Sequence, residues 1–367
     1  MAGLRHLGLR LLVLGAAAGG MAVALKRDVA RMDAESQPYE EGERNADAAG
    51  ARETGRGRQA ISPWQIPWRG WKDILLRIYK EIQEDRLLAV AAGVVFFGLL
   101  AFFPAVTAFV SLYGLFADPS TIRDHLDLAA SVMPAGAVQI LREQVERIVS
   151  KPPSTLGFAF LVSIAIALWS ANSGMKAVMD ALNVAYEEDE KRSFIRLNLI
   201  SLAFTIGGLI VLLLALSAVV IFPLILAAVG LDDWVQTIIW LIRWPVLLAF
   251  VILGLAVLYR FGPSRRAAKL QWITPGSLFA AVAWIAVSLL LSWYLQNFAN
   301  YNATYGSLGA AIGFMMWLWL SSIVILLGAE LNSEVEHQTA RDSTVGPEKP
   351  MGRRGAVMAD TVGAAQT

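Results

Sequence analysis

Long stretches without charged side chains alternate with short charged connections along this chain, a pattern that predicts membrane-spanning helices. The clearest stretch, Tyr305–Ala329, holds about 25 uncharged residues, enough for a helix to cross a hydrocarbon core of roughly 30 Å. Six such stretches predict an all-α polytopic membrane helix bundle with six core transmembrane helices. They are Leu87–Phe116, Leu156–Ala171, Leu197–Ile221, Trp240–Tyr259, Pro275–Phe298 and Tyr305–Ala329.

Small residues and prolines suggest how these helices pack. The last stretch begins with Gly306, Gly309 and Gly313, and a GxxxG step lets a neighbouring helix approach the backbone closely. This glycine face predicts helix packing and is also compatible with a homo-oligomer formed through the last transmembrane helix. Pro104 lies inside the first stretch and predicts a kink there.

An amphipathic helix precedes the first predicted span. Apolar residues recur at helical spacing from Trp71 to Ile82, and charged residues such as Asp73 and Arg77 occupy the other face. Such a helix can lie along the bilayer surface, and membrane lipids are therefore predicted partners. Packing against a soluble partner is the alternative.

The remaining segments divide the chain into four parts. Residues 1–25 form an apolar segment, for which a weak span, an interfacial segment and a cleaved signal peptide are the interpretations. Residues 26–63 are polar without an apolar period and predict a disordered linker. Residues 64–338 are the predicted membrane domain, and residues 339–367 a predicted disordered cytoplasmic tail.

Composition supports a membrane protein and excludes several other classes. The chain is 56% hydrophobic and 17% charged with a mean hydropathy of +0.53, whereas soluble domains have about 25% charged residues. The net charge of +1 gives no basic field for nucleic acid. The chain has no cysteine and three histidines, and it lacks the HExxH, GxSxG and GxxxxGK[ST] motifs. We therefore predict no catalytic residue, metal or cofactor.

Basic residues in the connections predict the orientation. They concentrate before the first stretch and in the connections after the second and fourth, where Arg196, Arg260 and Arg265 lie. Because cytoplasmic connections are enriched in lysine and arginine, both ends of the six-span core are predicted to face the cytoplasm.

A polar stripe follows the second stretch and is the first candidate site. Asn172, Lys176, Asp180, Asn183 and Glu187 fall on one helix face, and the spacing of Lys176 and Asp180 allows an ion pair. Paired charges within a membrane domain mark substrate or ion pathways. A solvated cytoplasmic extension of the helix is the alternative.

Glu330 is the second candidate, because it is the first charge after the longest apolar stretch. The orientation places it on the same side as Lys176, Arg196 and Arg260, any of which could pair with it. The alternative is a carboxylate in water at the helix end.

Several motifs resemble the YihY/virulence factor BrkB family over about Trp71 to His337. The most specific is YGSLGAAIGFMMWLWLSSIVILLGAELNSEVE, with FFPAVTAFVSLYGLFADP, ALNVAYEEDEKRSFIR and YRFGPSRR as further pieces. Within the first motif the matching residues are Tyr305, Gly306, Ser307, Leu308, Gly309, Trp317, Leu327, Gly328, Ala329, Glu330 and Asn332. The family often has a tyrosine and a serine upstream of the proline, where this chain has Phe96 and Ala101.

This resemblance implies a bacterial inner-membrane protein with six spans and cytoplasmic ends, but no agreed activity. Members were long labelled ribonuclease BN, and the residues present do not support nuclease chemistry. The expected function is therefore transporter- or permease-like, in the handling of an envelope lipid or another solute. A ribonuclease and a structural envelope scaffold are the alternatives.

Overall fold

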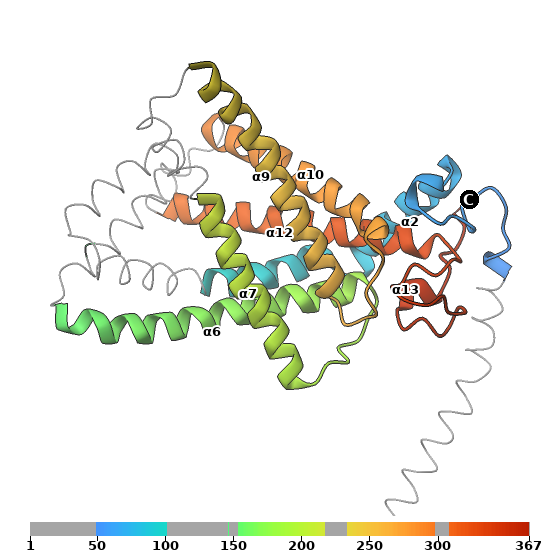
Figure 1. Ribbon diagram of the computed structural model, residues 1–367, viewed down its shortest axis with the longest axis horizontal. Helices are drawn as coiled ribbons and strands as arrows, with labels where there is room; N and C mark the ends of the chain where they lie inside the picture. Colours follow the sequence, from blue (N-terminus) through green and yellow to red (C-terminus); the bar gives the residue numbers. More distant parts are fainter. Residues whose placement is uncertain (1–48, 101–145, 147–152, 217–232, 298–307, 367) are drawn as a thin grey trace, which may run out of the picture. The chain divides into compact units, whose positions relative to one another are not determined.

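The computed structural model describes residues 49–100, 146, 153–216, 233–297 and 308–366. Residues Gly55–Thr367 form one compact unit and Met1–Thr54 another, and the architecture below is that of the longer unit (Figure 1). Its elements are η1 (Pro63–Gln65), α2 (Trp68–Glu84), the helix Leu87–Leu100, α6 (Pro153–Ala185), α7 (Phe194–Leu216), α9 (Asp233–Phe261), α10 (Leu270–Asn297), α12 (Leu308–His337) and α13 (Val357–Asp360).

The predicted helical class is confirmed for the described residues, which form helices and one isolated β-bridge between Ala268 and Thr344. Three of their helices are long and apolar enough to cross a membrane: Phe194–Val211, Leu270–Leu295 and Ala311–His337. The apolar helices Leu87–Leu100 and Pro245–Phe261 are shorter. The number of six spans remains a prediction.

The helix α12 lies against α10, α2 and α6, and its closest approach is to α10 at two glycines. A Cβ atom on Gly328 would lie 2.5 Å from Tyr259 Oη and 2.7 Å from Ala280 Cβ, and one on Gly276 would overlap the Gly328 carbonyl oxygen. The Gly276 amide also donates to Asn332 Oδ1 at 2.7 Å. Only glycine fits where two helix backbones approach so closely.

The glycines predicted to pack α12 lie nearer its beginning. Gly309 is buried, and a Cβ on Gly313 would lie 3.4 Å from Leu295 Cδ1 of α10. At Gly313 this face therefore packs within the chain, and self-association through it remains a prediction. Gly306 and Pro104 lie outside the described residues.

Large apolar side chains cover the outer faces of the long helices. Trp169 of α6, Leu199 of α7, Leu253 of α9 and Leu289 of α10 are all more than 60% exposed. A surface this apolar is typical of helices that face lipid rather than water.

Two polar segments expected to be disordered are packed against the helices. Residues 55–66 and 339–366, which we call the terminal cap, are joined by a hydrogen bond from the Ala340 amide to the Arg58 carbonyl oxygen. Arg58 is 1% exposed and donates to the carbonyl oxygens of Gln338 and Gly363 at 3.3 and 2.7 Å. This differs from the predicted disorder of 339–367 and of the linker up to residue 63. Buried arginines satisfy backbone carbonyl groups there, which composition does not reveal.

Candidate functional site at the charged end of α12

The last two turns of α12 are polar, yet they are buried. Glu330, Asn332, Ser333, Glu334 and Glu336 are each no more than 2% exposed. The helix α2 and the terminal cap cover this end of α12. The three glutamates must therefore find partners inside the protein, and each finds a different one.

Glu334 is paired with Arg77 of α2, which is 5% exposed. Arg77 Nε donates to Glu334 Oε2, Nη2 donates to Gln338 Oε1 at 2.7 Å, and Nη1 donates to the Ala364 carbonyl oxygen at 3.0 Å. His337 Nδ1 lies 3.5 Å from Glu334 Oε1. Every Arg77 nitrogen thus has an acceptor, and the pair ties α2, α12 and the cap together.

Glu336 is paired with Arg265, which lies between α9 and α10. Arg265 Nη2 is 2.5 Å from Glu336 Oε1, and the two side chains are 2% and 1% exposed. Ser343 Oγ donates to the same oxygen, and the guanidinium lies over the Tyr186 ring with Cζ 4.9 Å from the centroid. This ion pair joins the loop before α10 to α12, and the Ser343 hydrogen bond adds the cap.

A third ion pair anchors the beginning of α2. Arg56 Nη1 lies 2.7 and 2.6 Å from the two oxygens of Asp73, which is fully buried. The Gln366 amide donates to Asp73 Oδ1 at 3.0 Å. Like the two pairs above, it balances one buried carboxylate with one guanidinium.

Glu330 differs, because the charged neighbour with the largest effect on it is another carboxyl group, that of Asp85, just after α2. Two neighbouring carboxyl groups form a hydrogen bond only while they hold a proton between them. Among the described residues, neither group forms an ion pair with lysine or arginine. The partners suggested by charge placement, Lys176, Arg196 and Arg260, are not the ones found.

Further carboxylates lie around this pair, and they change how it titrates. Burial, and next the negative charge of Glu334, raises the pKa of Glu81 to about 7 from its ordinary 4.5. Burial also raises the pKa of Asp85, although the neighbouring Glu330 carboxyl acts in the opposite direction. The Glu81 carboxyl near the end of α2 can therefore exchange a proton near neutral pH.

The polar stripe on α6 does not form a single cluster. Lys176 Nζ donates to Asn198 Oδ1 at 2.5 Å rather than pairing with Asp180, and Asp180 is exposed. Asn183 is buried, donates to Glu190 Oε2 at 3.2 Å and accepts from the Ser264 amide at 2.7 Å.

Asn172 keeps a buried Oδ1 atom for which the described residues provide no hydrogen-bond partner. Asn183, by contrast, has a structural role, because its bonds to Glu190 and Ser264 join the loop after α6 to the loop after α9.

The three cytoplasmic arginines of the sequence prediction have different environments. Arg196 is exposed, Arg260 lies over the Phe261 ring with Cζ 5.3 Å from the centroid, and Arg265 forms the buried ion pair described above. The exposed Arg196 is suited to act as an orientation signal alone, whereas Arg265 also stabilises the fold.

Sequence reasoning missed most of the partners at this end of α12. Asp73, Arg77 and Glu81 were assigned to the polar face of the amphipathic helix. A usable signal was the spacing of four between Asp73 and Arg77 and between Arg77 and Glu81, which places all three on one stripe. Asp85 continues that stripe by another four residues, to the start of the first span.

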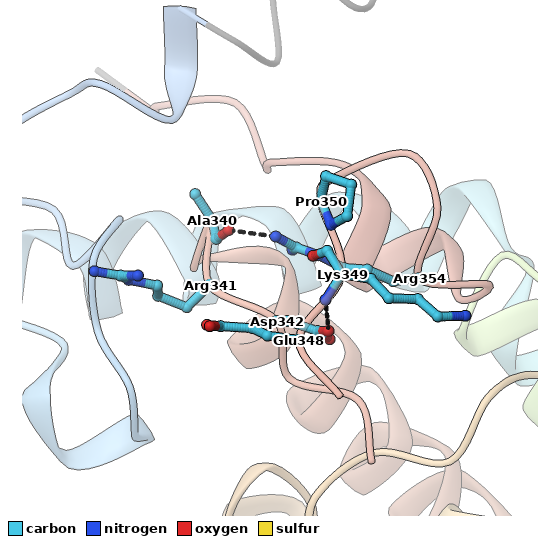
Figure 2. A pocket seen from close by; sticks show the side chains of 7 residues that line it. All are labelled: Ala340, Arg341, Asp342, Glu348, Lys349, Pro350 and Arg354. Carbon is cyan, nitrogen blue, oxygen red and sulfur yellow. Dashed lines mark hydrogen bonds between the residues drawn. The ribbon is translucent and has the colours of Figure 1, made fainter. Parts of the chain in front are cut away.

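A polar cavity of about 310 Å³ lies within the tail and is lined by residues of one loop between Ala340 and Arg354. Figure 2 shows Arg354 donating to the Ala340 carbonyl oxygen and the Lys349 amide donating to Asp342. Asp342 also accepts from Thr344. Because Arg354 and Asp342 are committed to the loop itself, we assign no ligand to this cavity. Elsewhere in the described part of the chain, no group of histidine, aspartate and glutamate residues could hold a metal ion.

Long apolar helices whose exposed faces are also apolar define the chain as an integral membrane protein of the all-helical class. It belongs to the BrkB virulence factor family, whose model, described as virulence factor BrkB, matches residues 78–352. The family resemblance noted from the sequence is thereby confirmed.

Three relatives illustrate the range of this similarity. The chain is 34% identical over 247 residues to the ribonuclease-like protein YfkH of Bacillus subtilis, covering 66% of this chain and 88% of the relative. It is 26% identical over 270 residues to a UPF0761 membrane protein of Neisseria meningitidis serogroup B, covering 71% and 62%.

A UPF0761 membrane protein of Xanthomonas campestris pv. campestris is 23% identical over 259 residues, covering 70% and 59%. The chain thus spans less than two thirds of the length of these last two relatives. No solved structure matches the chain.

Proposed function

We propose that this protein is a transporter- or permease-like component of the bacterial inner (plasma) membrane that moves a lipid, another amphiphile or a solute. The observation that carries the proposal is a pair of neighbouring carboxyl groups, Asp85 and the buried Glu330. In the proposed function, loss or gain of its proton accompanies movement of the substrate.

The chemistry of the pair favours this role over a purely structural one. Ionisable groups within a membrane domain are expensive and usually belong to substrate routes or proton relays. Glu334 and Glu336, further along α12, are neutralised by arginines, whereas the charged neighbour of Glu330 is another carboxyl group. In the proposed function one proton neutralises this pair, and its loss leaves two negative charges close together, which favours a rearrangement of α2 against α12.

The proposed orientation puts this pair at the cytoplasmic boundary. Basic residues before the first span and after the second and fourth predict that both ends of the six-span core face the cytoplasm. A proton could then exchange with the cytoplasm through the half-buried Asp85.

The test uses purified full-length protein in liposomes that contain fluorescent phosphatidylglycerol or phosphatidylethanolamine in the inner leaflet. We expect faster exposure of the probe to external dithionite than in protein-free liposomes, with a rate that differs between pH 6 and pH 8. Glu330→Gln should abolish the pH dependence, and Glu84→Gln, an exposed neighbour on α2, should retain it.

Native mass spectrometry of the same preparation covers substrates outside the tested lipids, because a bound amphiphile and the number of subunits appear in one measurement. Rates equal to protein-free liposomes, together with no retained lipid or solute, would contradict the proposal. The subunit count also tests the predicted homo-oligomer.

The name of one relative supplies a second candidate function. Because YfkH is called ribonuclease-like, purified protein should also be incubated with RNA. Cleavage that is lost in Glu330→Gln and retained in Glu84→Gln would favour a nuclease over a transporter.

A further inference from the structure

The helix α2 buries charged residues and exposes apolar ones. Asp73 and Arg77 are 0% and 5% exposed, whereas Trp68, Leu75 and Tyr79 are 76%, 52% and 65% exposed. The sequence had assigned Asp73 and Arg77 to the outer, polar face. The buried charges are explained by the ion pairs with Arg56 and Glu334, and the exposed apolar face requires a separate explanation.

The exposed face has a defined composition. At about 100° per residue the exposed side chains of α2 other than Glu84 cover an arc of about 140°, with Trp68, Leu75 and Tyr79 along one edge. All charged residues on this arc of α2 are basic, and they are Arg69, Lys72 and Lys80. The acidic residues of α2, Asp73, Glu81 and Glu84, lie outside it. Trp64 of η1 and Ile61 just before it are also exposed.

The position of α2 along the chain shows what this surface meets. Arg86 has a left-handed backbone with φ of 49°, so the chain turns between the end of α2 and the apolar helix Leu87–Leu100. A helix that stops at a turn directly before an apolar helix predicted to enter the membrane is expected at the depth of the lipid headgroups. Tryptophan and tyrosine favour that depth.

We propose that this face of α2, which we call the α2 arc, binds anionic phospholipid headgroups at the membrane surface. Trp68, Leu75 and Tyr79 insert between the headgroups and the upper acyl chains. Arg69 and Lys72 contact the phosphates, since each basic residue near an anionic surface contributes about 1 kcal/mol of attraction. The proposal is independent of whether the protein transports anything.

Because the chain has no cysteine, the depth of the α2 arc can be measured with single nitroxide labels. Leu75→Cys and Tyr79→Cys place a label on the arc, and Glu84→Cys places one on an exposed part of the same helix outside it. The full-length protein is reconstituted into nanodiscs. We expect the labels at 75 and 79 to be more accessible to oxygen than to a nickel chelate, and the label at 84 to show the reverse.

Three results would overturn the proposal. The first is nickel accessibility at 75 and 79 equal to that at 84, which would mean that the arc faces water. The second is spin–spin broadening at 75 or 79 that disappears on dilution with unlabelled protein, which would mean that a second copy covers it. The third is immobilised labels at 75 and 79 that neither oxygen nor nickel reaches, as expected for a buried protein contact.

A second measurement tests the charge of the partner. Spin-labelled phosphatidylglycerol and phosphatidylcholine are compared for association with the protein in mixed bilayers. We expect wild type to prefer phosphatidylglycerol, and Arg69→Gln/Lys72→Gln to lower this preference about twofold or more. Arg341→Gln/Lys349→Gln, which removes two exposed basic residues from the tail, should leave it unchanged. An equal preference in wild type and the α2 double variant would contradict recognition of anionic lipid.

Discussion

The end of α12 carries three buried glutamates, and they fall into two kinds of site. Glu334 and Glu336 face guanidinium groups within ion-pair distance, at Arg77 and Arg265. Glu330, one turn earlier on the same helix and equally buried, faces the carboxyl group of Asp85. Burial alone therefore does not tell which acids hold the fold together and which can change protonation.

The difference lies in what each partner allows. A guanidinium stays charged at every accessible pH, so the pairs at Glu334 and Glu336 are permanent. Two neighbouring carboxyl groups stay hydrogen-bonded only while they hold a proton between them, so we expect the contact between Asp85 and Glu330 to depend on pH. One helix end thus contains both a fixed anchor and an adjustable contact, and the predictions below separate them.

The largest expected effect comes from breaking the anchor at Arg77. Arg77→Ala leaves Glu334 buried without its guanidinium and removes the bonds to Gln338 and Ala364, so we expect the free energy of unfolding to fall by about 3–5 kcal/mol. Thermal unfolding of the purified protein in detergent measures this. Arg69→Ala, an exposed arginine of the same helix, is the control. A comparable midpoint of thermal unfolding in both variants would show that the Arg77–Glu334 ion pair does not stabilise the fold.

A matched pair of substitutions compares the two kinds of glutamate directly. Glu334→Gln should lower the free energy of unfolding by about 3 kcal/mol, because Arg77 keeps an unbalanced buried charge. Glu330→Gln should change it by less than about 1 kcal/mol, because the amide can donate to Asp85 as the protonated carboxyl does. An equal loss of stability in Glu334→Gln and Glu330→Gln at pH 7 would contradict this difference between the two glutamates.

The next effect concerns pH. The pKa of Glu81 is about 7 in the folded protein and 4.5 ordinarily, so the folded state binds more protons between these values. Its contribution to stability is therefore complete below about pH 4.5 and is lost as the pH rises through about 7. Glu81→Gln should raise the stability by about 1–2 kcal/mol at pH 8, after allowance for partial solvent screening.

Stability measured from pH 4.5 to pH 8 checks this prediction. The pH dependence should flatten in Glu81→Gln and persist in Glu84→Gln, an exposed neighbour. Identical pH profiles for wild type and Glu81→Gln would rule out titration of Glu81 in this range.

The smallest effect is expected at an ion pair whose carboxylate is exposed. Hydrogen bonds from Arg192 hold the pKa of Glu190 down at about 2, so the contribution of Glu190 to stability is present above about pH 4.5 and is lost as the pH falls through about 2. Because Glu190 is exposed, Glu190→Gln should lower the stability at pH 7 by no more than about 1 kcal/mol. A loss of stability as large as that expected for Arg77→Ala would show that burial does not decide how much these two ion pairs contribute.

The sequence predicted the helical elements better than their contacts. Uncharged stretches long enough to span a bilayer correctly predicted the helices α7, α9, α10 and α12. Such a stretch can be recognised from the hydropathy of one segment alone, without knowledge of its neighbours. The glycine contact at Gly328 was harder to predict, since GxxxG spacing pointed to Gly309 and Gly313 and not to a partner on α10. A close approach depends on two helices, and sequence spacing describes only one.

The candidate site was predicted in part. Glu330 was identified as the first charge after a long apolar run, but its partner was expected to be a cation. The sequence places Asp85 near basic residues, and only the packing of α2 against α12 brings it to Glu330. The ordered tail was missed for a similar reason, because Arg58 and Arg77 stabilise its backbone from far away in the chain.

The terminal cap also has a consequence for biosynthesis. Arg77 meets Glu334, a residue 257 positions later, and the Asp73 carboxylate accepts from an amide 293 positions later. A ribosome therefore produces α2 and most of the apolar helices long before these charges have partners. Membrane insertion can proceed segment by segment, but locking of α2 must wait until residues 334–366 have been translated. A chain interrupted before that point would have inserted helices and an unfastened α2.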